Sequence, residues 1–282
     1  MYMAIKPTLF SFFYTLLLIT PLLQNSANAA TPSVRKGLIK SSNININEKY
    51  TFKYCNPLRK KPFDKNSSKK KLLVIGDSQA CDFLNGIKEN GFFRNYQISM
   101  RYIPYQCQPV LSNHPSHFIA NKDRVICDDE ERTDNLEQAR EQIEEANLII
   151  FSARWKLKTA QALPHTIRHL KLKPYQRVVV LGSKSFGKIS IRRYLNMSDR
   201  KLLSIKNEID EKVEQVNSIL RTRLSHRIIY IDQYKLICGS SSDCPVFTSN
   251  LDLISYDGRH LTKAGARFVG SKIFKNSGLS RM

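Results

Sequence analysis

Lys70-Lys-Leu-Leu-Val-Ile-Gly-Asp-Ser78 is the stretch of sequence that decides the fold. The run from Leu72 to Ile75 is short and continuously apolar, which is typical of a strand buried on both faces of a parallel sheet. Gly76 allows a tight turn, and Asp77 can cap a helix that begins beside it. Ser78 is therefore predicted to lie at the carboxyl end of a central strand, where open α/β sheets bind ligands. Asp and Ser are also ordinary helix caps, so the turn alone does not identify a nucleophile.

A second segment, Asp257-Gly-Arg-His260, places a carboxylate and an imidazole three positions apart. At this spacing Asp257 can bond Nδ1 of His260 and leave Nε2 free to take a proton from a serine. A lone histidine ahead of a helix would be an ordinary surface residue, so the inference depends on the pairing. The two segments together predict Ser78 as nucleophile, His260 as base and Asp257 as the residue that orients His260.

Apolar strand patterns alternate with helical patterns along the rest of the chain. This alternation predicts an α/β fold, a three-layer sandwich with a mainly parallel five-stranded sheet. The predicted strands are Leu72–Ile75, Gln97–Tyr102, Leu148–Ser152, Arg177–Leu181 and Arg227–Ile231. The predicted helices lie near Asp82–Asn90, Thr133–Ala146, Thr159–Leu170 and Ser198–Leu224.

With both segments in place, the chain resembles the SGNH (GDSL) hydrolase superfamily over residues 70 to 275. It is most similar to the branch of SGNH-like domains fused to membrane acyltransferases that O-acetylate bacterial surface polysaccharides. The resemblance implies an SGNH/flavodoxin-like fold and an esterase or O-acetyltransferase activity. The residues that carry it are Ile75-Gly-Asp-Ser-Gln-Ala80, the Cys-x-Pro loop at Cys107, Ala153-Arg-Trp155, Cys238 and Cys244, and Asp257 to Leu261 followed by Gly265.

Two blocks that supply oxyanion-hole donors in this superfamily differ here. The loop Ile103–Cys107 has no glycine, and Phe151–Trp155 stands where Gly-x-Asn-Asp is usual. Loss of one oxyanion donor typically costs about a hundredfold or more in rate. The replacement candidates are the backbone amides of Ser78 and Gln106 and the guanidinium of Arg154. Arg154 would serve an oxyanion or a substrate carboxylate, and a role as an ordinary rim residue is the alternative.

The N-terminus has the pattern of a secretory signal peptide over residues 1–29. Lys6 precedes the apolar run Leu9–Ile19, and Ala27-Asn-Ala29 provides small residues for cleavage. The expected protein is exported, either periplasmic or extracellular, with an uncleaved N-terminal anchor as the alternative. The Asn-, Ser- and Lys-rich residues 30–69 are predicted to be a flexible extension, and residues 70–282 the hydrolase-like domain.

Six cysteines in a chain with an export pattern predict disulfides. No Cys-x-x-Cys or His-Glu-x-x-His motif occurs, so no metal site or cofactor is expected. The resemblance favours the pairs Cys107–Cys127 and Cys238–Cys244, which leaves Cys55 with Cys81.

The chain is strongly basic, with 45 Lys and Arg against 24 Asp and Glu and a formal net charge of +21. Such a charge attracts polyanions, which outside the cytoplasm are acidic polysaccharide, lipopolysaccharide, teichoic acid or the membrane surface. No nucleic-acid motif accompanies the basic residues, so no nucleic-acid partner is expected. The simpler interpretation of clusters such as Lys60-Lys61 is a solvated, solubilising face.

The sequence therefore predicts an exported serine esterase or O-acyltransferase that acts on O-acetyl groups of a cell-surface carbohydrate, through an acyl-serine. A separate membrane acyltransferase is a possible partner. Two alternatives stay open at this point. One is a non-catalytic SGNH-fold protein that binds an acidic glycan or a membrane acyltransferase, and the other is a lipolytic GDSL esterase.

Overall fold

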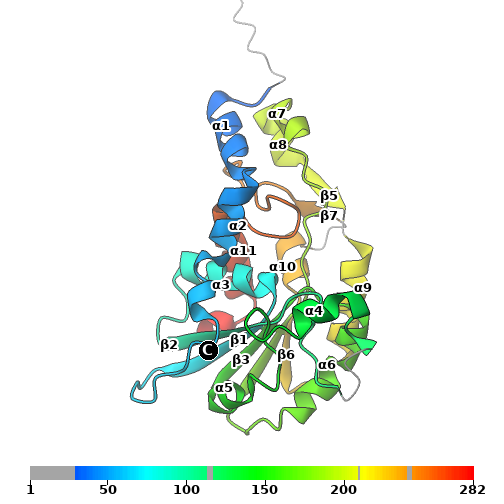
Figure 1. Ribbon diagram of the computed structural model, residues 1–282. Helices are drawn as coiled ribbons and strands as arrows, with labels where there is room; N and C mark the ends of the chain where they lie inside the picture. The colour runs from blue at the N-terminus through cyan, green and yellow to red at the C-terminus, as the bar shows by residue number, and fades with distance from the viewer. Residues whose placement is uncertain (1–28, 113–116, 209, 240–242) are drawn as a thin grey trace, which may run out of the picture.

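The computed structural model describes residues 29–112, 117–208, 210–239 and 243–282, and its centre is a five-stranded parallel sheet. The strand order is β2-β1-β3-β4-β6. Helices cover both faces of the sheet, so the molecule is the three-layer α/β sandwich that the sequence predicts (Figure 1). The strands are β1 (Lys70–Gly76), β2 (Tyr96–Tyr102), β3 (Leu148–Ser152), β4 (Arg177–Leu181) and β6 (Ile228–Ile231).

The two faces of the sheet support separate buried clusters. Leu72 and Val74 of β1 belong to one cluster, and the alternating Leu73 and Ile75 belong to the other. Burial on both faces explains why β1 is continuously apolar over Leu72–Ile75 instead of alternating. The first cluster includes residues of α3 (Ser78–Asn90), α10 (Gln233–Cys238) and α11 (Lys263–Asn276). The second includes residues of α5 (Arg140–Glu145), α6 (Leu157–His169) and α9 (Glu211–Arg223).

The region predicted as one long helix over Ser198–Leu224 is divided instead. It contains α8 (Asp199–Ser204), β5 (Lys206–Glu208) and then α9. Its strand β5 pairs antiparallel with β7 (Asp243–Pro245), and Asp210 caps α9 by accepting from the N–H groups of Lys212 and Val213. The cap and the strand pairing therefore interrupt the helix, although the apolar residues keep a helical spacing on both sides of the interruption.

The helix predicted over Thr133–Ala146 is shorter than expected. Only α5 remains of it, and α4 (Arg124–Cys127) precedes it. Asp134 is buried and accepts from the backbone N–H of Tyr102 at 2.9 Å and from Arg101 at 3.2 Å. These hydrogen bonds to β2 hold the chain at Asp134 in a non-helical conformation, although the local apolar pattern favours a helix there.

Residues 30–69 differ from the flexible extension that the sequence predicts, because they contain α1 (Pro32–Ser41) and α2 (Ile44–Lys53). Asn43 caps α2, and Leu38 and Thr51 are buried. Helix α1 lies beside α7 (Ile191–Leu195) and α8, beyond the carboxyl ends of the strands (Figure 1). Tertiary contacts hold these polar helices in place, which explains why their composition indicates no structure.

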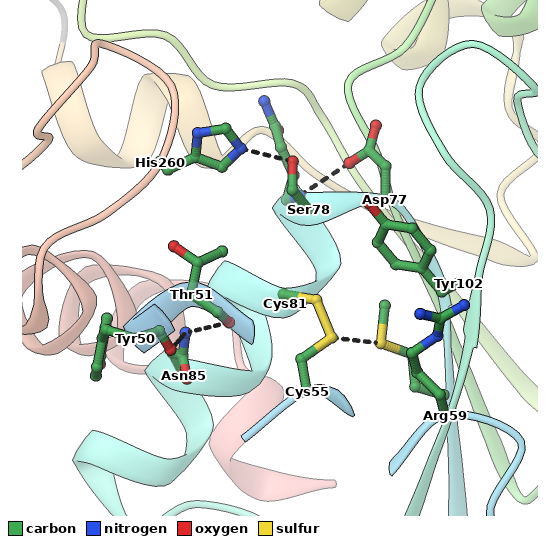
Figure 2. Close-up of a disulfide and its surroundings, with 12 residues drawn as sticks. Tyr50, Thr51, Cys55, Arg59, Asp77, Ser78, Cys81, Asn85, Tyr102 and His260 are labelled. Atoms are coloured by element: carbon green, nitrogen blue, oxygen red, sulfur yellow. Dashed lines mark hydrogen bonds between the residues drawn. A yellow bond between two sulfur atoms is a disulfide. The ribbon is translucent and has the colours of Figure 1, made fainter. Parts of the chain in front are cut away.

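Three disulfides, Cys55–Cys81, Cys107–Cys127 and Cys238–Cys244, connect loops and helices around the central sheet, and they are the pairs stated above. Figure 2 shows one of them, which joins the chain after α2 to the first turns of α3.

No described helix has the length and apolarity needed to span a bilayer. The expected signal peptide or anchor lies almost wholly in residues 1–28, outside the described residues.

Candidate active site

Strand β1 and helix α3 meet in a tight turn that presents Ser78 at the carboxyl edge of the sheet. Gly76 has a φ of +153°, and a Cβ there would lie 1.9 Å from the carbonyl oxygen of Ser152. Only glycine lets β3 approach so closely. Asp77 caps α3 by accepting from the N–H of Gln79 at 2.8 Å. Ser78 is thereby half-buried in the first turn of the helix, where backbone N–H groups have no intrahelical partner.

The structure brings the three predicted residues together. His260 Nε2 lies 2.8 Å from Ser78 Oγ, and His260 Nδ1 lies 2.6 Å from Asp257 Oδ2 (Figure 2 shows the first contact). A carboxylate only accepts hydrogen bonds, so we assign the imidazole proton to Nδ1 and the accepting lone pair to Nε2. In this tautomer Ser78 donates its hydroxyl proton to the base that would remove it.

The electrostatics of the pair favour an ionised Asp257. Burial opposes ionisation, but hydrogen bonds from the ring and backbone of His260 outweigh it and lower the pKa of Asp257 to about 2. For His260, burial opposes the charged form. The hydrogen bond with Asp257 and the charge of Asp82 outweigh burial and raise the pKa of His260 above its usual value. The arrangement can therefore stabilise the imidazolium that forms when a serine is deprotonated.

The loop that carries Asp257 and His260 is fixed by close backbone contacts. Gly258 has a φ of +87°, and a Cβ there would lie 2.0 Å from the carbonyl oxygen of Gly187. The carbonyl of Gly258 accepts from the N–H of Phe186 at 2.8 Å. Ser255 Oγ donates to the carbonyl of His260 at 2.7 Å and accepts from the N–H of Gly258 at 2.9 Å. The imidazole thus stands on a loop with little freedom to move.

A buried ion pair that the sequence did not indicate supports the same loop. Lys184 Nζ lies 2.7 Å from Asp82 Oδ2, and both side chains are 1% exposed. Lys184 also donates to the carbonyl of Arg259 at 3.3 Å, and Asp82 accepts from the N–H of Leu261 at 3.2 Å. The pair therefore holds the backbone on both sides of His260. Asp82 follows Ser78 by one helical turn, but nothing in the sequence around Lys184 distinguishes it from other lysines.

The oxyanion candidates have different surroundings. The backbone N–H of Arg154 donates to Asp77 Oδ2 at 2.9 Å, and its guanidinium lies over the ring of Tyr105. In the loop after β2, the N–H groups of Cys107 and Gln108 bond the carbonyl of Pro104. Gln106 offers its carbonyl to Lys156 Nζ at 2.8 Å. No hydrogen bond among the described residues joins Gln106 to Ser78, and the Ser78 amide remains the candidate with the best-defined position.

Asp77 connects the nucleophile turn to the loop after β3. Its two carboxylate oxygens accept from the N–H groups of Gln79 and Arg154. Burial raises the pKa of Asp77 to about 6, and these two bonds act in the opposite direction. The residue is fully occupied in shaping the turn, which agrees with its position on the far side of Ser78 from His260 in Figure 2.

A parallel α/β sandwich with serine, histidine and aspartate at its carboxyl edge defines the class of SGNH-type hydrolases and acyltransferases. The chain belongs to the family described as SGNH domain (fused to AT3 domains), whose sequence profile matches residues 46–275. The match begins before residue 70, so the family domain includes part of the predicted extension.

Two solved structures are similar to the chain at low sequence identity. One is a GDSL-like lipase from Parabacteroides merdae, with 10% identity, a TM-score of 0.38, and coverage of 77% of this chain and 100% of that one. The other is the C-terminal catalytic domain of peptidoglycan O-acetyltransferase A (OatA) from Streptococcus pneumoniae. It has 10% identity and a TM-score of 0.37, with coverage of 74% of this chain and 95% of that one. No curated protein matches the sequence significantly.

Proposed function

We propose that the protein is an exported serine esterase or O-acyltransferase that acts on O-acetyl groups of a cell-envelope carbohydrate. The observation that carries the proposal is the continuous hydrogen-bonded chain from Ser78 Oγ through His260 to Asp257, with distances of 2.8 Å and 2.6 Å. Membership of the SGNH family supports an enzyme of this class, and its description links such domains to AT3 acyltransferase domains. A membrane acyltransferase is accordingly the proposed partner that supplies or receives the acyl group.

The proposed reaction has two halves. Ser78 Oγ attacks the ester carbonyl while His260 Nε2 takes the hydroxyl proton, and Asp257 stabilises the imidazolium. The backbone N–H of Ser78, at the positive end of α3, is the proposed donor to the oxyanion. The tetrahedral intermediate collapses, His260 gives its proton to the departing alcohol oxygen, and an acetyl-serine remains. Water or a sugar hydroxyl then attacks the acetyl-serine by the same steps in reverse.

Export has independent support in the chemistry of the chain. Three disulfides suit an oxidising compartment, and the first 29 residues have the charge and apolar pattern of a signal peptide. The formal net charge of +21 suits association with an anionic envelope surface.

The test is turnover of para-nitrophenyl acetate beside a Ser78→Ala variant, with mass spectrometry for an acetyl group on Ser78. We expect both the adduct and the turnover to vanish in the variant, and sugar acceptors added to the wild type would then separate transfer from hydrolysis. A folded wild-type protein with neither an adduct nor serine-dependent turnover would contradict the proposal and favour the non-catalytic binding protein.

A further inference from the structure

Two arginine–tyrosine stacks stand beside the nucleophile turn. The guanidinium carbon of Arg59 lies 4.7 Å from the ring centre of Tyr102, and that of Arg154 lies 4.7 Å from the ring centre of Tyr105. A guanidinium held over the face of an aromatic ring by cation–π attraction can still use its N–H groups to bind carboxylate or phosphate with two hydrogen bonds. All four side chains are half-buried, so their orientation is restrained while they remain accessible.

Both stacks are attached to the turn that carries Ser78. Tyr102 is the last residue of β2, and in the parallel register it lies opposite Gly76 of β1. Gly76 precedes Ser78 by two residues. Arg154 is joined to the residue before Ser78 by the bond from its backbone N–H to Asp77 Oδ2, at 2.9 Å. Figure 2 shows the Tyr102 ring between Arg59 and Asp77. The charge of Asp77 also acts on the Tyr102 hydroxyl, whose pKa is raised mainly by burial.

Arg59 reaches the site from the N-terminal segment. The Cys55–Cys81 disulfide ties this segment to α3, and Arg59 forms an isolated parallel bridge with Met100 of β2. Its guanidinium donates to the carbonyl of Arg132 at 2.6 Å, which leaves the other N–H groups for a ligand. The disulfide and the bridge therefore place a cation on the Tyr102 ring, on the side away from Asp77, from a segment that precedes the sheet in the chain.

These cations have no acidic partner within the described part of the chain. Neither Arg59 nor Arg154 has a carboxylate oxygen within 4.0 Å among those residues, although Lys60 and Arg101 nearby both pair with Asp134. An acetyl ester is neutral, so the chemistry at Ser78 needs no guanidinium beyond an oxyanion donor. Two unpaired, stacked arginines are better explained by an anionic group elsewhere on the substrate.

We propose that Arg59 and Arg154 bind anionic groups, carboxylate or phosphate, of an acidic glycan whose O-acyl group is placed at Ser78. This inference rests on the proposed function and specifies its substrate class. Each arginine holds one anionic group through paired N–H donors, and the acyl-bearing sugar lies across the turn between them. In this proposal two of the protein's many basic residues bind substrate, in addition to any contribution of the others to solubility.

The test is a binding measurement by titration calorimetry with full-length Ser78→Ala protein, which cannot turn the ligand over. The ligands are galacturonic acid oligomers, the same oligomers with their carboxylates methyl-esterified, and glycerol phosphate oligomers. We expect an anionic oligomer to bind at least about tenfold more tightly than the neutral ester. Preference for the carboxylate or the phosphate oligomer assigns the anionic group.

Added substitutions localise that preference. Arg59→Ala and Arg154→Ala should each weaken anionic binding by about tenfold, and Arg154→Lys, which keeps the charge without the fork, should give an intermediate loss. Arg168→Ala is the matched control, because this exposed arginine lies in the last turn of α6, away from the site. Melting temperatures confirm that each variant is folded.

Equal binding of the acidic and neutral oligomers would overturn the inference, as would equal losses in the Arg59, Arg154 and Arg168 variants, which would indicate a diffuse charge effect. Because binding is measured without turnover, charge-selective binding in a protein without serine-dependent turnover would reject the proposed activity alone. Serine-dependent turnover with no preference for the acidic oligomers would reject the inference alone.

Discussion

Substitution of Lys184 by Met is expected to destabilise the protein strongly, because it breaks a buried ion pair beside the site. Among the described residues, the substitution leaves the Asp82 carboxylate, whose side chain is 1% exposed, with only the N–H of Leu261 at 3.2 Å as a hydrogen-bond donor. Removal of one partner from a buried ion pair costs about 3–5 kcal/mol, which corresponds to a fall in melting temperature on the order of 10 °C for a domain of this size. Urea denaturation followed by circular dichroism measures the loss.

The double variant Asp82→Leu with Lys184→Met is the informative control. It removes both charges and replaces them with apolar side chains of similar length, so we expect it to recover most of the stability lost in the single variant. The reasoning would be refuted by a single variant that loses less than about 1 kcal/mol, or by a double variant at least as unstable as the single one. Acetyl ester turnover should fall in both, because Lys184 no longer holds the carbonyl of Arg259.

Three further predictions concern the loop that carries the base. Asp257→Asn should lower acetyl ester turnover by about 10⁴-fold with little change in melting temperature. The amide keeps the geometry but favours the wrong tautomer of the His260 ring. Since the pKa of His260 is raised and the neutral ring is the base, kcat/KM of the wild type should fall as the pH drops through a midpoint above 6.5. A pH profile with its midpoint below 6.5 would contradict this, and Asp257→Asn should move the midpoint to lower pH. Gly258→Ala should lower both turnover and melting temperature, because its Cβ would meet the carbonyl oxygen of Gly187 at 2.0 Å. Gly239→Ala, with a φ of +79° and no atom within 4 Å of its Cβ, carries only the backbone strain of about 1–3 kcal/mol. Equal losses in the two glycine variants would rule out the close contact as the cause.

The strands of the central sheet can be predicted from the sequence because short runs of neighbouring residues identify them. A continuous apolar run before a glycine identifies β1, and the Asp-x-x-His spacing identifies the loop at Asp257, so the proximity of Ser78 and His260 follows once the fold is known. The helices of residues 30–69 were missed because tertiary contacts and a disulfide hold them, and their own composition is polar.

Two other features could not be predicted for a related reason. Lys184 and Arg59 acquire their positions from partners far away in the chain, and neither belongs to a motif. The long helix predicted over Ser198–Leu224 was wrong because a cap at Asp210 and the pairing of β5 with β7 interrupt an otherwise regular apolar spacing. Patterns of local hydrophobicity contain no information on such pairings.

The distance along the chain between the serine and its histidine also has a consequence for the newly made protein. Ser78 and His260 are separated by 182 residues. At about 5–20 residues per second, a ribosome needs roughly 10 to 40 s to add the base after it has added the nucleophile. During that interval the serine is an ordinary alcohol, and strand β1 can pair with β2 and β3 without any reactive group beside it. If the proposed activity is correct, the chain therefore has no complete site for most of its own synthesis.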